Sequence, residues 1–159
     1  MKKSSQPPKF EEKKVLLRNK KARHDYFVEQ EIEAGIALQG SEVKSLREAK
    51  GVISDAYVMV RHGEAWLVNL QIAEYAWANV FNHAPKRDRK LLLHRREIDK
   101  LDERTSQAGM TALPLEVYLL KGKIKVLVGV CRGKKHYDKR EDQKRKDAAR
   151  EVEAALKRR

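Results

Sequence analysis

The sequence has very little cysteine and no long apolar run. Its 159 residues include one cysteine, Cys131, which can form neither an internal disulfide nor a multi-thiolate zinc site. No apolar stretch approaches the roughly 18 residues that a membrane-spanning helix needs, and no apolar segment typical of a secretion signal follows the basic start. These absences argue against a secreted or membrane protein, so we expect a cytoplasmic protein in a reducing compartment.

The sequence also lacks the motifs of common catalytic and cofactor sites. It contains no G-x-G-x-x-G, no P-loop and no G-x-S-x-G, and its five histidines are scattered without metal-ligand spacing. Cys131 ends an apolar run, which favours a buried, inert thiol. His24 and Asp25, the only adjacent pair of a histidine and a carboxylate, are the only candidates for catalysis. We therefore expect no enzyme, no cofactor and no metal.

Acidic residues are too few to balance the basic ones, and the net charge is +13. Residues 1–24 hold nine Lys or Arg against two Glu, and residues 132–159 hold twelve against six Asp or Glu. Residues 25–131 hold fifteen of each sign. A neutral body with two basic ends is typical of a protein that grasps a polyanion, because each neutralised phosphate releases counterions. A solubility tail and a membrane-surface tail are the alternatives.

Alternating apolar and polar residues predict about six strands, enough for a closed or nearly closed small barrel. Two pairs of them read as hairpins, one turning at His62-Gly63 and one near Gly122. Gly35 interrupts the first strand and predicts a bend or bulge there. The expected strand segments are 26–38, 56–61, 66–72, 115–119 and 124–130. The first segment is counted as two strands, one on each side of Gly35.

Two helices are predicted between the strands. Ser41 can cap a short helix that Gly51 ends. A longer helix is expected over 91–104 after a loop at 82–90, with His94 on its apolar stripe as a satisfied core histidine. We therefore divide the chain into a flexible basic arm (1–17), a barrel (18–132) and a basic tail (133–159). The apolar face of the tail is thin, so we expect it to stay disordered until it meets a partner.

Four basic segments flank the predicted barrel and favour RNA as the polyanion. On the last strand, Lys123 and Lys125 alternate with apolar core residues, so both ammonium groups should face outward. Tyr137 lies among cations, which suits base stacking beside phosphate contacts. The four segments are 18–24, 86–90, 121–125 and 132–137, and from them we predict RNA contacts at Lys90, Lys123, Lys125, Lys134 and Lys135.

Four blocks of the sequence resemble the signature blocks of the bacterial SsrA-binding protein family, also called small protein B. They follow in the order of the family and span about 18–140: NKKARHDYF (19–27), EAGIALQGSEVKSLREAKG (33–51), RKLLLHRREI (89–98) and GKKHYDKR (133–140). The resemblance implies a mainly β fold, a six-stranded antiparallel barrel of the oligonucleotide-binding (OB) type with flanking helices and a basic C-terminal tail.

The resemblance also implies a function and partners. Family members bind transfer-messenger RNA and accompany it to stalled ribosomes for trans-translation, with elongation factor Tu as a further partner. The body clasps the tRNA-like part of the RNA, and the tail enters the decoding region and the empty message channel, where it becomes helical. The protein itself catalyses nothing, and we expect a monomer that does not contact a membrane.

The resemblance also implies individual site residues. Glu33, Leu92 and Lys125 match positions that hold transfer-messenger RNA, although the residues alone favour a core position for Leu92. Glu33 would accept from a base amino group or orient a neighbouring cation. Further positions match the block before the first strand and the decoding-site element of the tail, and these are Asn19, Arg23, His24, Tyr137, Asp138, Lys139 and Arg140.

Two other functions compete with this interpretation. The first is a general RNA-binding module or ribosomal protein built on a similar barrel. The second is a nuclease or nucleotide-modifying enzyme that would use His24 and Asp25.

Overall fold

The computed structural model of the protein describes residues 13–78 and 82–158. The strands are β1 (Lys14–Arg18), β2 (Tyr26–Ile36), β3 (Gly51–Val52), β4 (Tyr57–Arg61), β5 (Glu64–Val68), β6 (Gln71–Ile72), β7 (Arg89–Leu92), β8 (Met110–Leu120) and β9 (Lys123–Gly133). The helices are α1 (Lys20–Asp25), α2 (Gly40–Arg47), α3 (Arg95–Thr105) and α4 (His136–Lys157).

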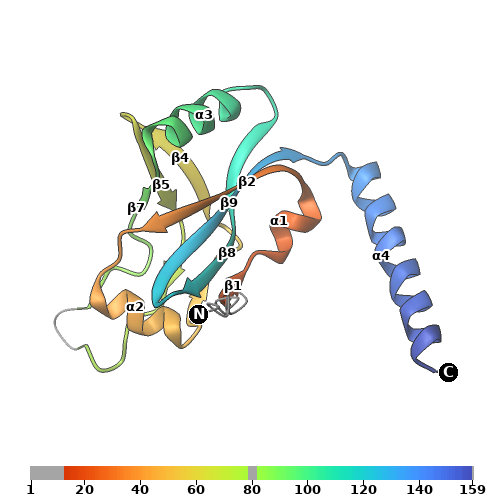
Figure 1. Cartoon of the computed structure of the whole chain (residues 1–159), viewed down its shortest axis with the longest axis horizontal. Coiled ribbons are helices and arrows are strands. Elements are labelled where there is room, and N and C mark those ends of the chain that lie inside the picture. The colour runs from red at the N-terminus through yellow and green to blue at the C-terminus, as the bar shows by residue number, and fades with distance from the viewer. Residues whose placement is uncertain (1–12, 79–81, 159) are drawn as a thin grey trace, which may run out of the picture.

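Six strands form a closed ring in the order β8-β4-β5-β7-β2-β9, and β9 pairs back with β8. All of these pairings are antiparallel. Helices α2 and α3 lie at opposite ends of the ring, and α4 projects away from it (Figure 1). The predicted fold class, a mainly β antiparallel barrel with flanking helices and a basic C-terminal tail, is therefore confirmed.

Both predicted hairpins are present, and each turns through two residues with positive φ. The β4–β5 turn has φ of 52° at His62 and 73° at Gly63, and the β8–β9 turn has 51° at Lys121 and 72° at Gly122. Two such residues match the twist of the flanking strands in a two-residue hairpin loop. Local turn chemistry thus fixes the register of four of the ring strands.

The barrel interior is filled by the apolar residues of the alternating pattern. Cys131 is fully buried in a separate, smaller apolar cluster with Ala22, Leu113 and Leu115, and this burial raises the pKa of its thiol to about 11. It is the inert thiol that the sequence predicts. The fully buried interior includes Ala65, Leu67, Val117, Val126, Val128 and Val130.

The irregularity predicted at Gly35 lies elsewhere in β2. The register of β2 against β9 shifts between Val28 and Gln30, whereas Gly35 pairs with Lys125 of β9 and Leu92 of β7. A Cβ at Gly35 would lie 3.1 Å from Leu92 Cβ. The glycine therefore permits a close approach of β7 rather than a bulge.

The helix expected over 91–104 begins later. Residues 89–92 form β7, and α3 starts at Arg95. His94 is the N-cap of α3 and is exposed, with its backbone N–H bonded to Glu97 at 3.1 Å. The prediction of a core histidine there was wrong, because the apolar residues Leu91 and Leu92 belong to a strand with its own alternation. Similarly, α2 has Gln39 rather than Ser41 as its N-cap.

The two ends of the chain contain more regular structure than we expected. Residues 14–17, assigned to the flexible arm, belong to β1, which pairs with β8; residues 1–12 lie outside the described residues. The basic segment at 20–25 forms α1, and most of the tail forms α4. Within the described residues, none of the helices is both long and apolar enough to cross a membrane.

Candidate RNA-binding surface

A groove of about 780 Å³ opens where β2, β7, the β4–β5 turn and the start of α3 meet. Four predicted RNA-binding residues line it: Glu33, Lys90, Leu92 and Lys125. A second groove, which shares Leu92 and Lys125, adds Lys123. The barrel thus brings residues from three separate segments of the sequence to one surface, which we call the groove face.

Leu92 is 55% exposed on the groove face, and the preference for a core position was wrong. Burial alternates along β7, so that Arg89 and Leu91 point inward while Lys90 and Leu92 point outward. An exposed leucine between two lysines forms a small apolar platform beside positive charge.

Glu33 is held in place by Tyr118, a covered residue on the outer face of β8 that pairs with Lys125 of β9. The Tyr118 hydroxyl donates a hydrogen bond to its carboxylate, and Tyr118 itself is only 2% exposed. Burial, together with the carboxylate of Glu33, raises the pKa of Tyr118 well above its usual range, so the hydroxyl keeps the proton it donates. Among the described residues no Lys or Arg forms an ion pair with Glu33, which leaves the carboxylate as an acceptor for a base amino group.

The lysines of the groove face differ in their availability. Lys90 forms an ion pair with Glu64 at 3.1 Å. Lys123 and Lys125 alternate with the inward-facing residues of β9, as predicted. The part of the chain that the structure describes provides neither of them with a carboxylate partner, so both can meet phosphate.

The basic segment 86–90 is not one phosphate site. Arg89 is fully buried; its guanidinium forms an ion pair with Glu42 and donates to the Pro85 carbonyl at 3.1 Å. The Arg87 Nε also donates to Glu42, at 3.1 Å. Two of the cations in this segment therefore hold the fold together.

Asn19 stabilises the fold and does not reach the surface. It is 2% exposed; its Oδ1 accepts from the backbone N–H of Ala22 at 3.0 Å, and its Nδ2 donates to the Pro114 carbonyl at 2.9 Å. These are the contacts of an N-cap for α1. The RNA contact predicted for Asn19 stays a prediction, and in this structure the side chain is occupied by the fold, whereas the neighbouring Arg23 and His24 are exposed.

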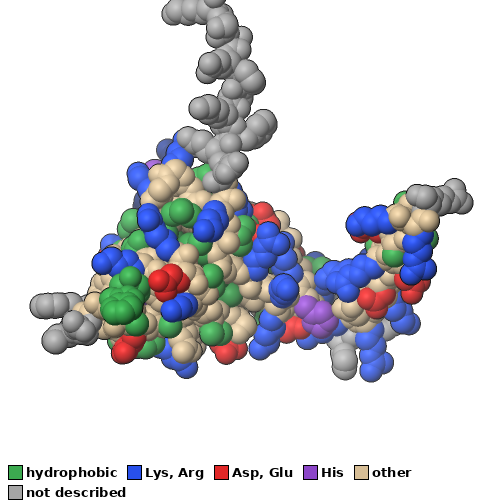
Figure 2. Space-filling model, turned by 90° about the horizontal axis from the view of Figure 1, so that it is seen from below, with side chains coloured by type: hydrophobic (Ala, Val, Ile, Leu, Met, Phe, Trp, Pro, Cys, Tyr) green, Lys and Arg blue, Asp and Glu red, His purple; other side chains and the backbone are tan. Residues whose placement is uncertain are grey.

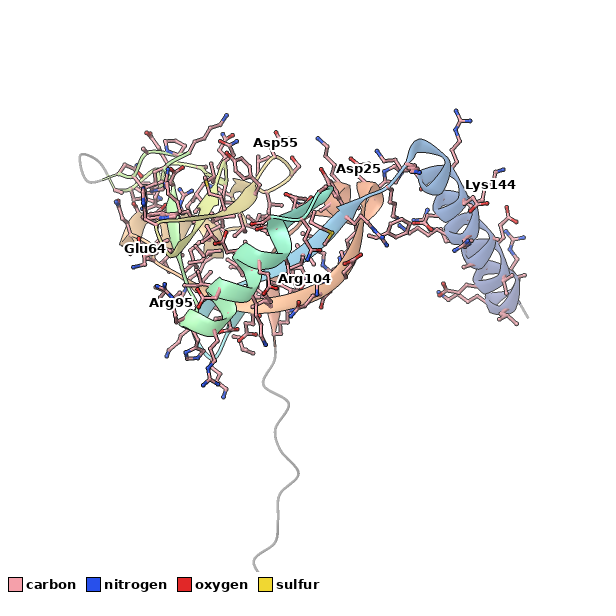
Figure 3. The ribbon with its side chains drawn as sticks, turned by 90° about the horizontal axis from the view of Figure 1, so that it is seen from above. Asp25, Asp55, Glu64, Arg95, Arg104 and Lys144 are labelled. Atoms are coloured by element: carbon pink, nitrogen blue, oxygen red, sulfur yellow. The ribbon has the colours of Figure 1, made fainter. Side chains whose placement is uncertain are left out.

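Asp25 connects α1 to the start of α4. His24 Nδ1 lies 2.8 Å from its Oδ1, and Lys139 Nζ lies 3.4 Å from the same oxygen. The hydrogen bond with His24 comes first among the causes that lower the pKa of Asp25, and Lys139 adds to it. In Figure 3, Asp25 lies on the side of the barrel toward α4, whereas Glu64 and Arg95 lie at the far side.

Some of the predicted tail residues contact other side chains of the protein, and others are exposed to solvent. The Lys134 ammonium lies 4.8 Å from the centroid of the Phe27 ring and forms an ion pair with Asp142, so Lys134 is largely covered. Lys135 and Arg140 are exposed. Tyr137 and Asp138 belong to the first turn of α4.

Two groove residues were missed by the sequence analysis. His62, interpreted only as a turn residue, lines the groove, and so does Arg95. The Arg95 Nη1 would lie 3.0 Å from a Cβ at Gly63, which places the guanidinium against the hairpin turn. Only the correct start of α3 could have revealed Arg95, and nothing in the pattern around His62 signals its position.

The described residues contain no group of three or more His, Cys, Asp or Glu that could hold a metal ion. What the fold gathers instead is an exposed leucine, a fixed carboxylate and two lysines without acidic partners. These groups suit recognition of a nucleotide strand better than bond cleavage.

Comparison with known proteins shows the family of the chain. The profile of the family described as SmpB protein matches residues 16–158. The chain belongs to the SmpB family. The resemblance found in the sequence blocks is therefore confirmed over nearly the whole chain.

Several SmpB family members are close relatives. The SsrA-binding protein of Acetivibrio thermocellus is 54% identical over 147 residues, which cover 92% of this chain and 96% of the relative. That of Shouchella clausii is 52% identical over 148 residues, covering 93% and 95%. An SmpB chain in a solved structure described as "tmRNA-SmpB: a journey to the center of the bacterial ribosome" matches with a TM-score of 0.65 and 45% identity, covering 76% of this chain and 85% of that one.

Proposed function

We propose that this protein binds transfer-messenger RNA through the groove face and delivers it to stalled ribosomes for trans-translation. The supporting observation is that Leu92 is exposed between Lys90 and Lys125, beside the fixed carboxylate of Glu33. A base can lie over the leucine while its phosphates meet lysines and its amino group meets Glu33. The names of the SsrA-binding relatives point to the same RNA.

The basic tail carries the second half of the proposal. Helix α4 projects from the barrel (Figure 1), and its charged side chains from Lys144 to Lys157 are exposed. On the ribosome, the segment from Tyr137 to Arg140 enters the decoding region and the rest of the tail follows the empty message channel. The protein acts there as a cytoplasmic monomer beside elongation factor Tu, and it catalyses no step.

The binding half is tested with transfer-messenger RNA and two matched lysine variants. Lys125→Ala removes a cation of the groove face, whereas Lys100→Ala removes an exposed cation of α3 that lies outside the grooves. We expect weaker RNA binding from the first variant alone in a filter-binding titration. Equal affinities would contradict the assigned surface. RNA recovered with the protein from cells should be one dominant tRNA-like species, and a broad mixture would favour a general RNA-binding module instead.

The tail half is tested at Tyr137. A ring flanked by cations can stack on an exposed base, which is worth roughly 1–3 kcal/mol. Tyr137→Ala should impair peptide transfer to the RNA on stalled ribosomes while free RNA binding stays intact, and Tyr137→His should retain activity because an imidazole also stacks. If both variants transfer peptide equally well, the ring does not stack.

A further inference from the structure

Trp77 is the most exposed of the large apolar side chains that the structure describes, with 81% of its surface open to solvent. The other tryptophan, Trp66, is half-buried on β5. An indole in water forgoes burial of a large apolar surface. We therefore expect a feature of the local structure to keep Trp77 exposed.

The turn that carries Trp77 is hydrogen-bonded at its base. The Ala78 N–H donates to the Tyr75 carbonyl at 3.1 Å, which closes a four-residue turn with Trp77 at its tip. The side-chain amide of Asn82 then binds both backbone groups of Tyr75, accepting from the N–H at 3.1 Å and donating to the carbonyl at 2.8 Å. The asparagine acts like a strand partner and holds the turn shape.

The residue after Asn82 anchors the segment to the barrel. His83 is 3% exposed; its Nδ1 lies 2.8 Å from Ser41 Oγ and its Nε2 lies 2.9 Å from the Ile72 carbonyl. A carbonyl only accepts, so Nε2 carries the proton and Nδ1 accepts from the serine hydroxyl. The exposure of Trp77 is thus the result of a fixed turn and not of an untethered loop.

A lysine lies beside the turn, and a hollow at the turn lies next to the second groove at the start of α2. The Lys44 ammonium lies 5.5 Å from the centroid of the Tyr75 ring, and no described carboxylate forms an ion pair with it. Lys44 and Ala78 border a shallow hollow of about 350 Å³. The second groove is lined by Leu38 and Val43, the chain neighbours of Gln39 and Lys44, which line the hollow. Figure 2, which views the α2 end of the barrel, shows hydrophobic and basic side chains together on this side.

We propose that the RNA-binding surface extends from Lys125 past the start of α2 to Trp77, where an unpaired nucleotide of the bound RNA stacks on the indole. Lys44 would neutralise a phosphate of that nucleotide. Stacking on an aromatic ring beside a cation is the general mode by which proteins hold single-stranded nucleotides. This inference rests on the proposed RNA-binding function and adds a contact outside the groove.

The first test reports on Trp77 directly. In a Trp66→Phe variant of the full chain, Trp77 is the only indole, and its fluorescence in the free protein should be readily quenched by acrylamide. Adding transfer-messenger RNA should quench the emission and protect the remainder from acrylamide. If the RNA binds in a manner that depends on Lys125 but the accessibility of Trp77 to acrylamide does not change, the inference is overturned and the proposed function is left intact. Protection that appears only when ribosomes are added would also overturn it.

The second test compares affinities. Trp77→Ala should weaken binding of transfer-messenger RNA roughly 5- to 150-fold, the range that loss of one stacked base implies. Trp77→Phe should retain most of the affinity, and Val52→Ala, which trims an apolar residue that is also exposed, should retain all of it. Equal affinity of the Trp77→Ala and Trp77→Phe variants would overturn the stacking contact. Failure of every variant and of the unaltered chain to bind the RNA would overturn the proposed function, and the inference with it.

Discussion

Leu91 and Leu92 are chain neighbours in opposite environments, and this makes them a matched pair for separating stability from binding. Leu91 is 1% exposed and Leu92 is 55% exposed. Leu91→Ala should cost about 2–5 kcal/mol of unfolding free energy because it leaves a core cavity. Leu92→Ala should change stability by less than about 0.5 kcal/mol and yet weaken RNA binding.

Urea unfolding and RNA titration of the two variants check this expectation. A Leu92→Ala variant that binds RNA normally would remove the apolar platform from the binding surface. A Leu92→Ala variant as unstable as Leu91→Ala would mean that the side chain packs in the core after all.

Glu42 is fully buried with Arg89, and its charge should make stability depend on pH. Burial alone would raise its pKa, but hydrogen bonds from Arg87, the Gln39 N–H and Arg89 more than offset this, so the pKa lies below its usual range. A lowered folded-state pKa stabilises the fold above the ordinary Glu pKa of about 4.3, and this stabilisation is lost as pH falls through the lowered value.

Glu42→Gln should therefore destabilise the protein by about 3–5 kcal/mol at neutral pH, because it leaves a buried guanidinium without its counter-charge. The difference from the unaltered chain should shrink in acid, where the carboxylate of the unaltered chain also takes a proton. Urea titrations of both proteins across the acid range measure this. A pH-independent difference would show that packing, and not charge, accounts for the loss.

Among the helices and strands, local sequence patterns predicted the features that depend only on residues close together in the sequence. The β4–β5 and β8–β9 hairpins follow from alternation and from turns at His62-Gly63 and Gly122, and both are present. Strand β7 was missed because one of its inward residues, Arg89, is charged. Its counter-ion, Glu42, comes from α2, and no local pattern reveals a pairing between distant segments.

The same limit applies to the candidate site. The outward direction of Lys123 and Lys125 followed from strand alternation. The exposure of Leu92 and the burial of Asn19 could not be predicted from alternation. Leu92 depends on where β7 starts and Asn19 on where α1 starts, and contacts with another part of the chain set both starts. Residues in regular strands could be oriented from sequence, whereas residues at element boundaries could not.

Helix α4 should be separable from the barrel. Its described contacts with the body run through Lys139 to Asp25 and through Lys134 to Asp142, and Val152 is 61% exposed. Surface ion pairs contribute about 0–1 kcal/mol each, and the covered Lys134 keeps its contact with the Phe27 ring when Asp142 is removed. A chain ending after Lys135, which loses both pairs, should therefore unfold within about 2 kcal/mol of the full chain, bind RNA nearly normally and fail to support tagging on stalled ribosomes.

Thermal unfolding, RNA titration and a tagging assay on the shortened chain check this division. The assay must include the full chain at equal concentration as its control. Loss of RNA binding by a well-folded shortened chain would contradict it, since α4 would then belong to the RNA-binding surface.

At the scale of the whole molecule, closure of the ring brings the sequence blocks together. Strands β2, β7 and β9 are distant in sequence, yet they are adjacent in the barrel and carry Glu33, Leu92 and Lys125 on one surface. Five of the six ring strands were predictable from periodicity, whereas β7 was missed, and the expected total of about six counted β2 on both sides of Gly35. The order in which the strands pair was not predicted, because it depends on long-range contacts.

The distribution of charge predicts how binding responds to salt. The excess charge lies at the chain ends, whereas 25–131 is neutral, and Lys123 and Lys125 supply cations on the groove face without described acidic partners. If about five phosphates are neutralised, the affinity for RNA should fall with salt along a log–log slope of about −4. Because each phosphate contact contributes up to about one unit, Lys125→Ala should flatten the slope by that amount, while Lys100→Ala should leave it unchanged. Titrations at a series of potassium chloride concentrations give both slopes. A slope near zero would mean that affinity comes from the apolar and hydrogen-bonding contacts around Leu92 and Glu33, with the basic ends free for the ribosome.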